Sequence, residues 1–328
     1  MFNRSGPFHT YLFWFLLGGL LMYATPGHAQ SNDAERHVLL IGGLGGNSDY
    51  AATFEKYLYD TRRALIDEFE VPAGHITVLA GSNEASENFI DGASTAENIR
   101  TEFDRLAARA DTTDRVFIIL FGHGSFNGEE ASLNIPRRDL SDRDFAGLVR
   151  RLAADRIVFV NTAPSSGPFI EALSGPNRIV ITATRSGRQR NETIFPRYFV
   201  DALSAPRADI DQNNRLSVNE AFRYAAEMTS QWFEDNGNVP SEHALLEDTG
   251  DGKGVRLNEL ENAGDGNLAA ITYFDAPVPE TAAAASARGA SAEADQTRKR
   301  QLEEKIAALK SKKNSMDTST YYEQLERL

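Results

Sequence analysis

Five short apolar runs, separated by longer amphipathic stretches, limit this chain to a layered α/β fold. The runs lie at residues 37–43, 76–79, 115–121, 156–160 and 178–182. Strands that are apolar along their length belong in a parallel sheet that is covered on both faces. Helical spacing of apolar residues fills the stretches between and after them, at 52–69, 95–109, 142–154, 194–203 and 218–233. The pattern predicts a doubly wound, mostly parallel sheet with helices on both faces.

The N-terminus predicts an export signal. Arg4 is followed by an apolar run at 11–23 and by small residues that end at Ala29. The run is shorter than the about 20 residues that a membrane span needs. We therefore expect a signal peptide at 1–29, cleavage after Ala29, no stable membrane insertion after cleavage, and a periplasmic or secreted product. An uncleaved anchor is the alternative.

The rest of the chain divides into a main domain, a linker and a tail. We expect the domain at 30–276, a flexible linker of small residues at 277–294, and a charged helical tail at 295–328. Thr320 and Glu323 have the spacing of a capping box for a last helix at 321–328. The tail either docks on its own domain or associates with a partner through a short coiled coil.

Composition excludes several classes of function. The formal net charge of −13 argues against nucleic acid and anionic membranes as partners. Cysteine is absent, so thiolate catalysis, disulfides and zinc–thiolate sites are all excluded.

The loop after the third apolar run carries the first candidate functional residue. Ligands of doubly wound sheets bind beyond the carboxyl ends of the strands. His123 lies there between Gly122 and Gly124, and glycines allow a substrate to approach the backbone closely. A loop histidine without a function is the alternative.

The order of parts around His123 resembles that of the legumain-type peptidases, which share the caspase-like fold. These enzymes have a strand, a His-Gly pair, a helix, and then a strand that ends in an Ala-Cys-x-Ser-Gly nucleophile turn. Here His123 and Gly124 precede a predicted helix, and the strand at 156–160 leads into Ala163, Pro164 and Ser165 and then Ser-Gly. The resemblance covers roughly residues 37–203. It implies that His123 is the catalytic histidine and that the Gly124 N–H belongs to the oxyanion hole.

The departure from this family determines the expected function. Pro164 stands at the position of the nucleophilic cysteine, and proline offers no nucleophilic atom. The residues at 46–51 also lack the arginine with which these enzymes recognise asparagine. We therefore expect a pseudo-peptidase that binds a protein or peptide segment at the former cleft. One alternative is a serine-dependent hydrolase that uses His123 with Ser165 or Ser166. Another is a structural module stabilised by calcium.

Residues 209–220 match the spacing of an EF-hand loop. Oxygen ligands stand at its first, third, fifth, seventh (by its carbonyl), ninth and twelfth positions: Asp209, Asp211, Asn213, Arg215, Ser217 and Glu220. Asn214 replaces the usual glycine, and asparagine tolerates a positive φ better than most residues. Ligands made only of oxygen favour Ca²⁺, so we expect one structural calcium. An acidic turn without an ion is the alternative.

A weaker version of this pattern begins at Glu247. It has acids and glycines like a cation loop, but Asn258 stands at its twelfth position. We expect a turn without an ion there.

Overall fold

The computed structural model describes residues 34–81, 88–275, 298, 301, 302, 305, 306, 309 and 316–328. The predicted signal peptide at 1–29, the linker at 277–294 and part of the helical tail expected at 295–328 lie outside these residues. No helix among the described residues is long and apolar enough to cross a membrane.

The main sheet has seven strands and is parallel except at one edge. Its strands are β1 (Arg36–Gly42), β2 (Ile76–Ala80), β3 (Gly92–Ala93), β4 (Arg115–Phe121), β8 (Arg156–Asn161), β9 (Arg178–Thr182) and β10 (Leu245–Glu247). Their order in the sheet is β10-β9-β8-β4-β1-β2-β3, and β10 pairs antiparallel with β9. The five predicted strands and their mostly parallel arrangement are confirmed.

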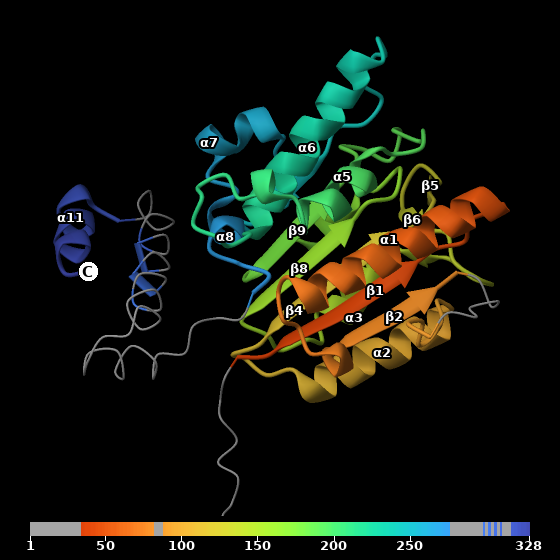
Figure 1. Ribbon diagram of the computed structural model, residues 1–328, viewed down its shortest axis with the longest axis horizontal. Helices are drawn as coiled ribbons and strands as arrows, with labels where there is room; N and C mark the ends of the chain where they lie inside the picture. The colour runs from red at the N-terminus through yellow and green to blue at the C-terminus, as the bar shows by residue number, and fades with distance from the viewer. Residues whose placement is uncertain are drawn as a thin grey trace, which may run out of the picture. The chain divides into compact units, whose positions relative to one another are not determined.

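Helices cover both faces of the sheet (Figure 1). They are α1 (Ser48–Asp67), α2 (Ala96–Arg109), α3 (Asp142–Val149), α4 (Phe169–Leu173), α5 (Phe195–Ala202) and α6 (Val218–Asp235). One apolar core joins α1, α5 and α6 to the side chains of one sheet face, and a second core joins α2, α3 and α4 to the other face. The alternation along β4 serves both cores, because Phe117 and Phe121 belong to the first and Ile118 to the second. The doubly wound architecture is therefore confirmed.

Shorter elements complete the described part of the chain. They are η1 (Ala73–His75), η2 (Pro206–Ala208), η3 (Leu257–Glu259), α7 (Leu260–Ala263), α8 (Asn267–Ala270) and α11 (Thr318–Glu326). A small antiparallel sheet, which we did not predict, is made of β5 (Gly124–Phe126), β6 (Ala131–Leu133) and β7 (Leu140–Ser141) in that order. Because β5 begins directly after His123, this sheet holds the candidate histidine loop.

Three predicted helix boundaries are wrong. The helix expected at 52–69 begins at Ser48, because the Asn47 side chain accepts the N–H groups of Asp49 and Tyr50 and caps it there. The helix expected at 142–154 ends at Val149, and the chain then runs through a turn into β8. The last helix begins at Thr318, because the Asp317 side chain accepts the Thr320 N–H and caps it. The capping box expected from Thr320 and Glu323 is therefore not the cap of this helix. An aspartate is as good an N-cap as a threonine, so spacing alone did not identify the correct one.

The strand order fixes where a ligand site belongs. The chain goes from β1 outward to β2 on one side and returns to β4 on the other side. This reversal is a topological switch point, and ligands of such sheets bind beyond the carboxyl ends of the strands there. The register aligns Gly42 at the end of β1 with Phe121 at the end of β4, and Leu120 with Asn161 of β8. The loops after β1, β4 and β8 therefore meet at one edge of the sheet.

Candidate functional site

His123 lies at this edge, between the loop after β1 and the first turns of α1. Its Nε2 atom is 3.2 Å from the carbonyl oxygen of Gly45. Its ring meets Tyr50 edge-on at 4.7 Å and Phe54 at 5.2 Å between ring centroids. The residue is partly exposed. Gly45 has to be glycine, since a Cβ atom there would lie 2.3 Å from the Ala51 nitrogen. The imidazole is thus held by one hydrogen bond and two aromatic rings.

Gly124 packs directly against the turn that follows β8. A Cβ atom at Gly124 would lie 2.1 Å from the carbonyl oxygen of Pro164, so no other residue fits without a shift of the backbone. Hydrogen bonds join Asn127 to Glu130 and Asn134 to His123, which makes Gly124 a member of a non-hydrogen-bonded pair between β5 and β6. The Gly124 N–H therefore points away from β6. This orientation suits the oxyanion-hole donor that the family resemblance implies.

His123 and Pro164 line the same small pocket, together with side chains from α1 and from the loop after β9. Its lining includes Phe54, Tyr57, His123, Thr162, Pro164 and Glu192. The Tyr50 hydroxyl donates a 2.7 Å hydrogen bond to Glu192 and closes one side of the approach to His123. Burial raises the pKa of Tyr57, which remains a neutral phenol at ordinary pH. The structure thus brings together His123 and Pro164, the two residues that the resemblance to legumain-type peptidases aligns with the catalytic pair.

The two candidate serines point into the protein. Ser165 is fully buried, and its N–H donates to the Gln189 carbonyl at 2.8 Å. Its Oγ atom has no hydrogen-bond partner, and its φ of +60° is unusual for a residue other than glycine. The Ser166 Oγ atom lies 3.1 Å from the Thr184 Oγ1 atom and accepts the Thr184 N–H. Ser166 therefore joins the turn to the end of β9.

The chemistry available at this edge is that of a positioned imidazole without a thiol beside it. Pro164 offers only a ring and a carbonyl oxygen. The His123 imidazole hydrogen-bonds to the Gly45 carbonyl and to neither serine. Sequence reasoning missed Tyr50, Phe54 and Glu192 as parts of the site. Their signal was faint, because two lie on a helix that reads as amphipathic and the third lies in a polar loop.

Comparison of this chain with protein-family models and with curated proteins found no match in either case.

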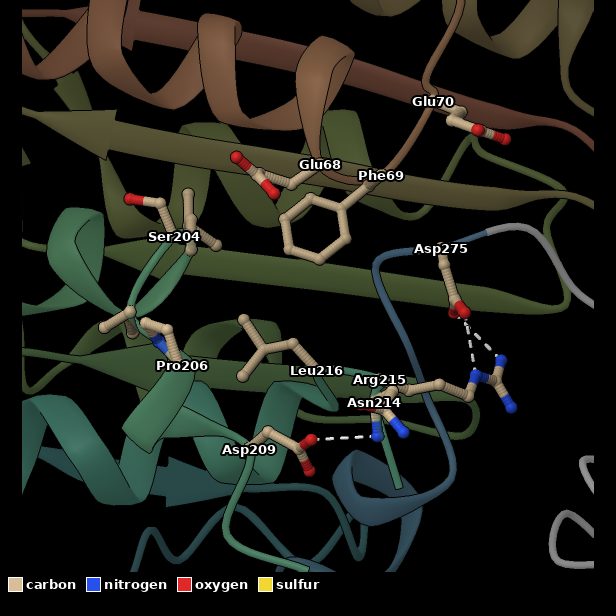
Figure 2. Close-up of a pocket in the computed structure, with 13 residues that line it drawn as sticks. Glu68, Phe69, Glu70, Ser204, Pro206, Asp209, Asn214, Arg215, Leu216 and Asp275 are labelled. Atoms are coloured by element: carbon tan, nitrogen blue, oxygen red, sulfur yellow. Dashed lines mark hydrogen bonds and ion pairs between the residues drawn. The ribbon is translucent and has the colours of Figure 1, made fainter. Parts of the chain in front are cut away.

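The acidic loop lies between η2 and α6. Figure 2 shows Asp209, Asn214 and Arg215 of this loop beside a pocket that Asp275 also lines. Asp209, Asp211 and Glu220 each bring a carboxylate oxygen within 4.8 Å of the others. Asn214 adopts a φ of +63°, as the position of the usual glycine requires. The Arg215 guanidinium forms an ion pair with Asp275 at 2.7 Å, while the Arg215 N–H donates to the Asn213 side chain within the loop.

The hydrogen bonds of this loop are compatible with a cation at its centre. Asp209 accepts the N–H groups of Asn213 and Asn214 at 3.0 and 2.8 Å. Glu220 accepts the N–H and the hydroxyl of Ser217, and both residues form the capping box of α6. Burial raises the pKa of Glu220, and burial with the nearby Asp209 charge raises the pKa of Asp211. A bound cation would offset this repulsion.

The loop that begins at Glu247 is also acidic and more buried than the sequence indicated. Asp248 accepts the N–H groups of Gly266 and Ala269, both at 2.8 Å, and Asp265 accepts the Asp248 N–H at 3.1 Å. Burial, and the neighbouring acids, raise the pKa of Asp248 to about 6 and that of Asp265 to about 7. Asn258, the residue at the twelfth position, takes part in none of these hydrogen bonds. Our expectation of a turn without an ion stays a prediction.

Glu242 holds the start of α5, next to the candidate cleft, through hydrogen bonds to the backbone. Its carboxylate accepts the N–H groups of Ile194 and Phe195 at 2.6 and 3.4 Å, at the start of α5. Thr193 and Pro196, which flank Ile194 and Phe195 in the sequence, line the pocket of His123. Glu242 is only 4 % exposed, and burial raises its pKa to about 7. The free energy of unfolding should therefore depend on pH through this group.

We predict that Glu242→Gln flattens the dependence of stability on pH. The pKa of Glu242 is about 7 in the folded chain, whereas the ordinary value, which we take for the unfolded chain, is 4.5. Between these values the folded state binds more protons than the unfolded state, so stability falls as pH rises, by up to about 3 kcal/mol. The variant should lose this contribution and be more stable than the wild type at pH 8, as measured by urea unfolding from pH 4.5 to 8.

Glu234→Gln is the matched control, since it removes an exposed carboxylate from α6. It should leave the pH profile unchanged. Parallel profiles for Glu242→Gln and the wild type would contradict the assignment.

Proposed function

We propose that this chain is an exported, legumain-like protein of the caspase-like fold that has lost peptidase activity and binds a protein or peptide segment at the former cleft. The observation that carries the proposal is the contact between the histidine loop and the turn of Pro164. Gly124 lies against the Pro164 carbonyl, and His123 lines the same pocket. These are the two places that hold the catalytic pair in legumain-type enzymes, and a chain without cysteine has no nucleophile for the second.

The cleft retains features that suit binding. Tyr50, Phe54 and Tyr57 give it an aromatic wall on α1, and Glu192 adds a carboxylate. Aromatic side chains beside a few polar groups are typical of ligand-binding surfaces. The Gly124 N–H, which points away from β6, is the donor that we expect to meet a peptide carbonyl, without any need for catalysis.

A serine-dependent hydrolase remains the second candidate, because of one observation. Ser165 is held at a positive φ with an unpartnered hydroxyl, directly after Pro164. Strain of this kind often accompanies functional residues. Against it, the hydroxyl is fully buried. A serine nucleophile also needs a base within hydrogen-bond distance, and His123 instead contacts Gly45.

A peptide-binding experiment tests the first proposal. A peptide selected from a library on the purified chain should bind without being cleaved. Tyr50→Ala should weaken its binding at least tenfold, because removal of a central aromatic anchor costs about 2 kcal/mol or more. Fluorescence anisotropy measures the affinity, and mass spectrometry shows whether the peptide is intact.

Tyr59→Ala is the matched control on the same helix, since Tyr59 is 46 % exposed and contacts Phe89 instead of His123. It should bind the peptide like the wild type. Failure to retain any peptide would favour the structural module, and equal loss in both variants would contradict binding at the cleft.

A fluorophosphonate probe tests the second candidate. We expect no labelling of Ser165 or Ser166, because the first is buried and the second bonds to Thr184. Labelling of either serine that disappears in His123→Ala would show an active hydrolase and overturn the pseudo-peptidase.

We further propose that the loop at 209–220 binds one structural Ca²⁺. The convergence of Asp209, Asp211 and Glu220 supports this proposal, together with the positive φ of Asn214. Oxygen-only ligands of this spacing suit calcium. The ion would join η2 to the start of α6, so its expected role is stability.

Thermal melting in calcium and in chelator tests this site. At a free Ca²⁺ concentration 100 times the Kd, the gain is about 2.7 kcal/mol, which corresponds to a rise in Tm of about 5–10 °C. Asp209→Ala should abolish the rise. Asp251→Ala, in the loop that we expect to bind no ion, serves as the control and should keep it. An equal Tm with and without calcium in the wild type would contradict the proposed calcium site.

A further inference from the structure

A second group of metal-ligating side chains lies at the opposite edge of the sheet, at the amino ends of β1, β2 and β4. We propose that Glu35, His37 and His75 form a binding site for a divalent transition-metal ion of the zinc class. This site is independent of the candidate cleft and of the acidic loop.

The strand register brings the two histidines together. Val38 of β1 pairs with Ile76 of β2, so His37 and His75 precede a matched pair of residues on neighbouring parallel strands. Their rings stack with centroids 5.3 Å apart and planes at 29°. His37 lies in β1 and His75 ends η1 just before β2, so the two are far apart in sequence, which is why the sequence did not indicate this site.

The ligand atoms converge. The Nε2 atoms of His37 and His75 lie 3.7 and 3.8 Å from the same carboxylate oxygen of Glu35. One atom from each of the three residues lies within 4.8 Å of the others. Distances of about 2.0–2.1 Å from zinc to each ligand require ligand atoms to be about 3–4 Å apart, and the two separations from Glu35 fall in this range.

Asp114 supports the group from the third strand. Arg36 pairs with Arg115 in the register of β1 and β4, which places Glu35 next to Asp114. The Asp114 carboxylate accepts the Glu35 N–H at 2.7 Å and lies 3.3 Å from the His37 Nε2 atom. Because its carboxylate faces the same Nε2 atom that would bind the ion, Asp114 is available as a fourth ligand.

The imidazole rings of His37 and His75 make their polar contacts through Nε2, the atom that faces the carboxylates of Glu35 and Asp114. The Nδ1 atoms of His37 and His75 are buried and have no hydrogen-bond partner, whereas both Nε2 atoms face carboxylates. His37 is 1 % exposed, but His75 and Glu35 are 22 % and 53 % exposed at their side chains. The site is thus built on a buried histidine and remains open to an ion from solvent.

The donor set distinguishes this site from the acidic loop. Two imidazoles and a carboxylate suit zinc and related ions, while calcium prefers oxygen ligands. Arg109 is a nearby cation, and its guanidinium donates to the Gly74 carbonyl at 3.4 Å. The competing interpretation is a pair of histidines that only shares hydrogen bonds with the two acids.

Zinc titration of the untagged, chelator-treated chain tests the proposal. The titration is done by calorimetry in excess calcium, so that the acidic loop does not contribute. We expect one equivalent of zinc, and cobalt in its place should give the visible absorption of a nitrogen- and oxygen-ligated ion. His75→Gln and Glu35→Gln should each lower the zinc affinity at least tenfold. Both residues are partly exposed, so these variants should fold, and circular dichroism checks this.

His123→Gln and Asp209→Asn are the controls, since they change the other two sites of the chain. Both should bind zinc like the wild type. Absence of a zinc equivalent in the wild type would overturn the proposal, and so would an unchanged affinity in folded His75→Gln.

Discussion

The burial of β4 between two strands and two helical layers is the constraint on which the rest of this structure depends. All seven of its residues are buried, and it pairs in parallel with β1 on one side and β8 on the other. Its side chains alternate between two different cores. A slip of one residue would move every side chain to the wrong core. The same slip would shift His123 by about 3.3 Å along the strand direction and break its contact with Gly45. The energy that fixes the strand therefore also fixes the cleft.

The main strands were predictable because a strand that is buried on both faces consists of an uninterrupted run of apolar residues. Residues 115–121 and 178–182 were expected at the bounds that the structure shows. The small sheet of β5, β6 and β7 was not, because its strands have two or three residues and alternate with polar positions. β10 was missed for the same reason. Short strands are specified by their partners more than by their own residues.

The candidate sites also differ in how far their residues lie apart in the sequence. His123, Pro164 and the acidic loop stood out because each sits in a local pattern of neighbouring residues. The aromatic wall of Tyr50 and the pair of His37 and His75 depend on segments that meet only in the folded chain. Local spacing cannot report contacts between residues that are distant in sequence. The sheet register can, and it places one group of polar side chains at each end of the parallel strands.

The twelfth residue of the acidic loop has two tasks at once. Glu220 is the loop's last carboxylate, and it is also the residue that completes the capping box at the start of α6. Both of its oxygens already accept hydrogen bonds, two from residues 210 and 211 and two from Ser217. The Ca²⁺ that we propose for this loop would draw on the same carboxylate that caps a long helix. Its binding and the order of the α6 terminus would therefore be thermodynamically linked.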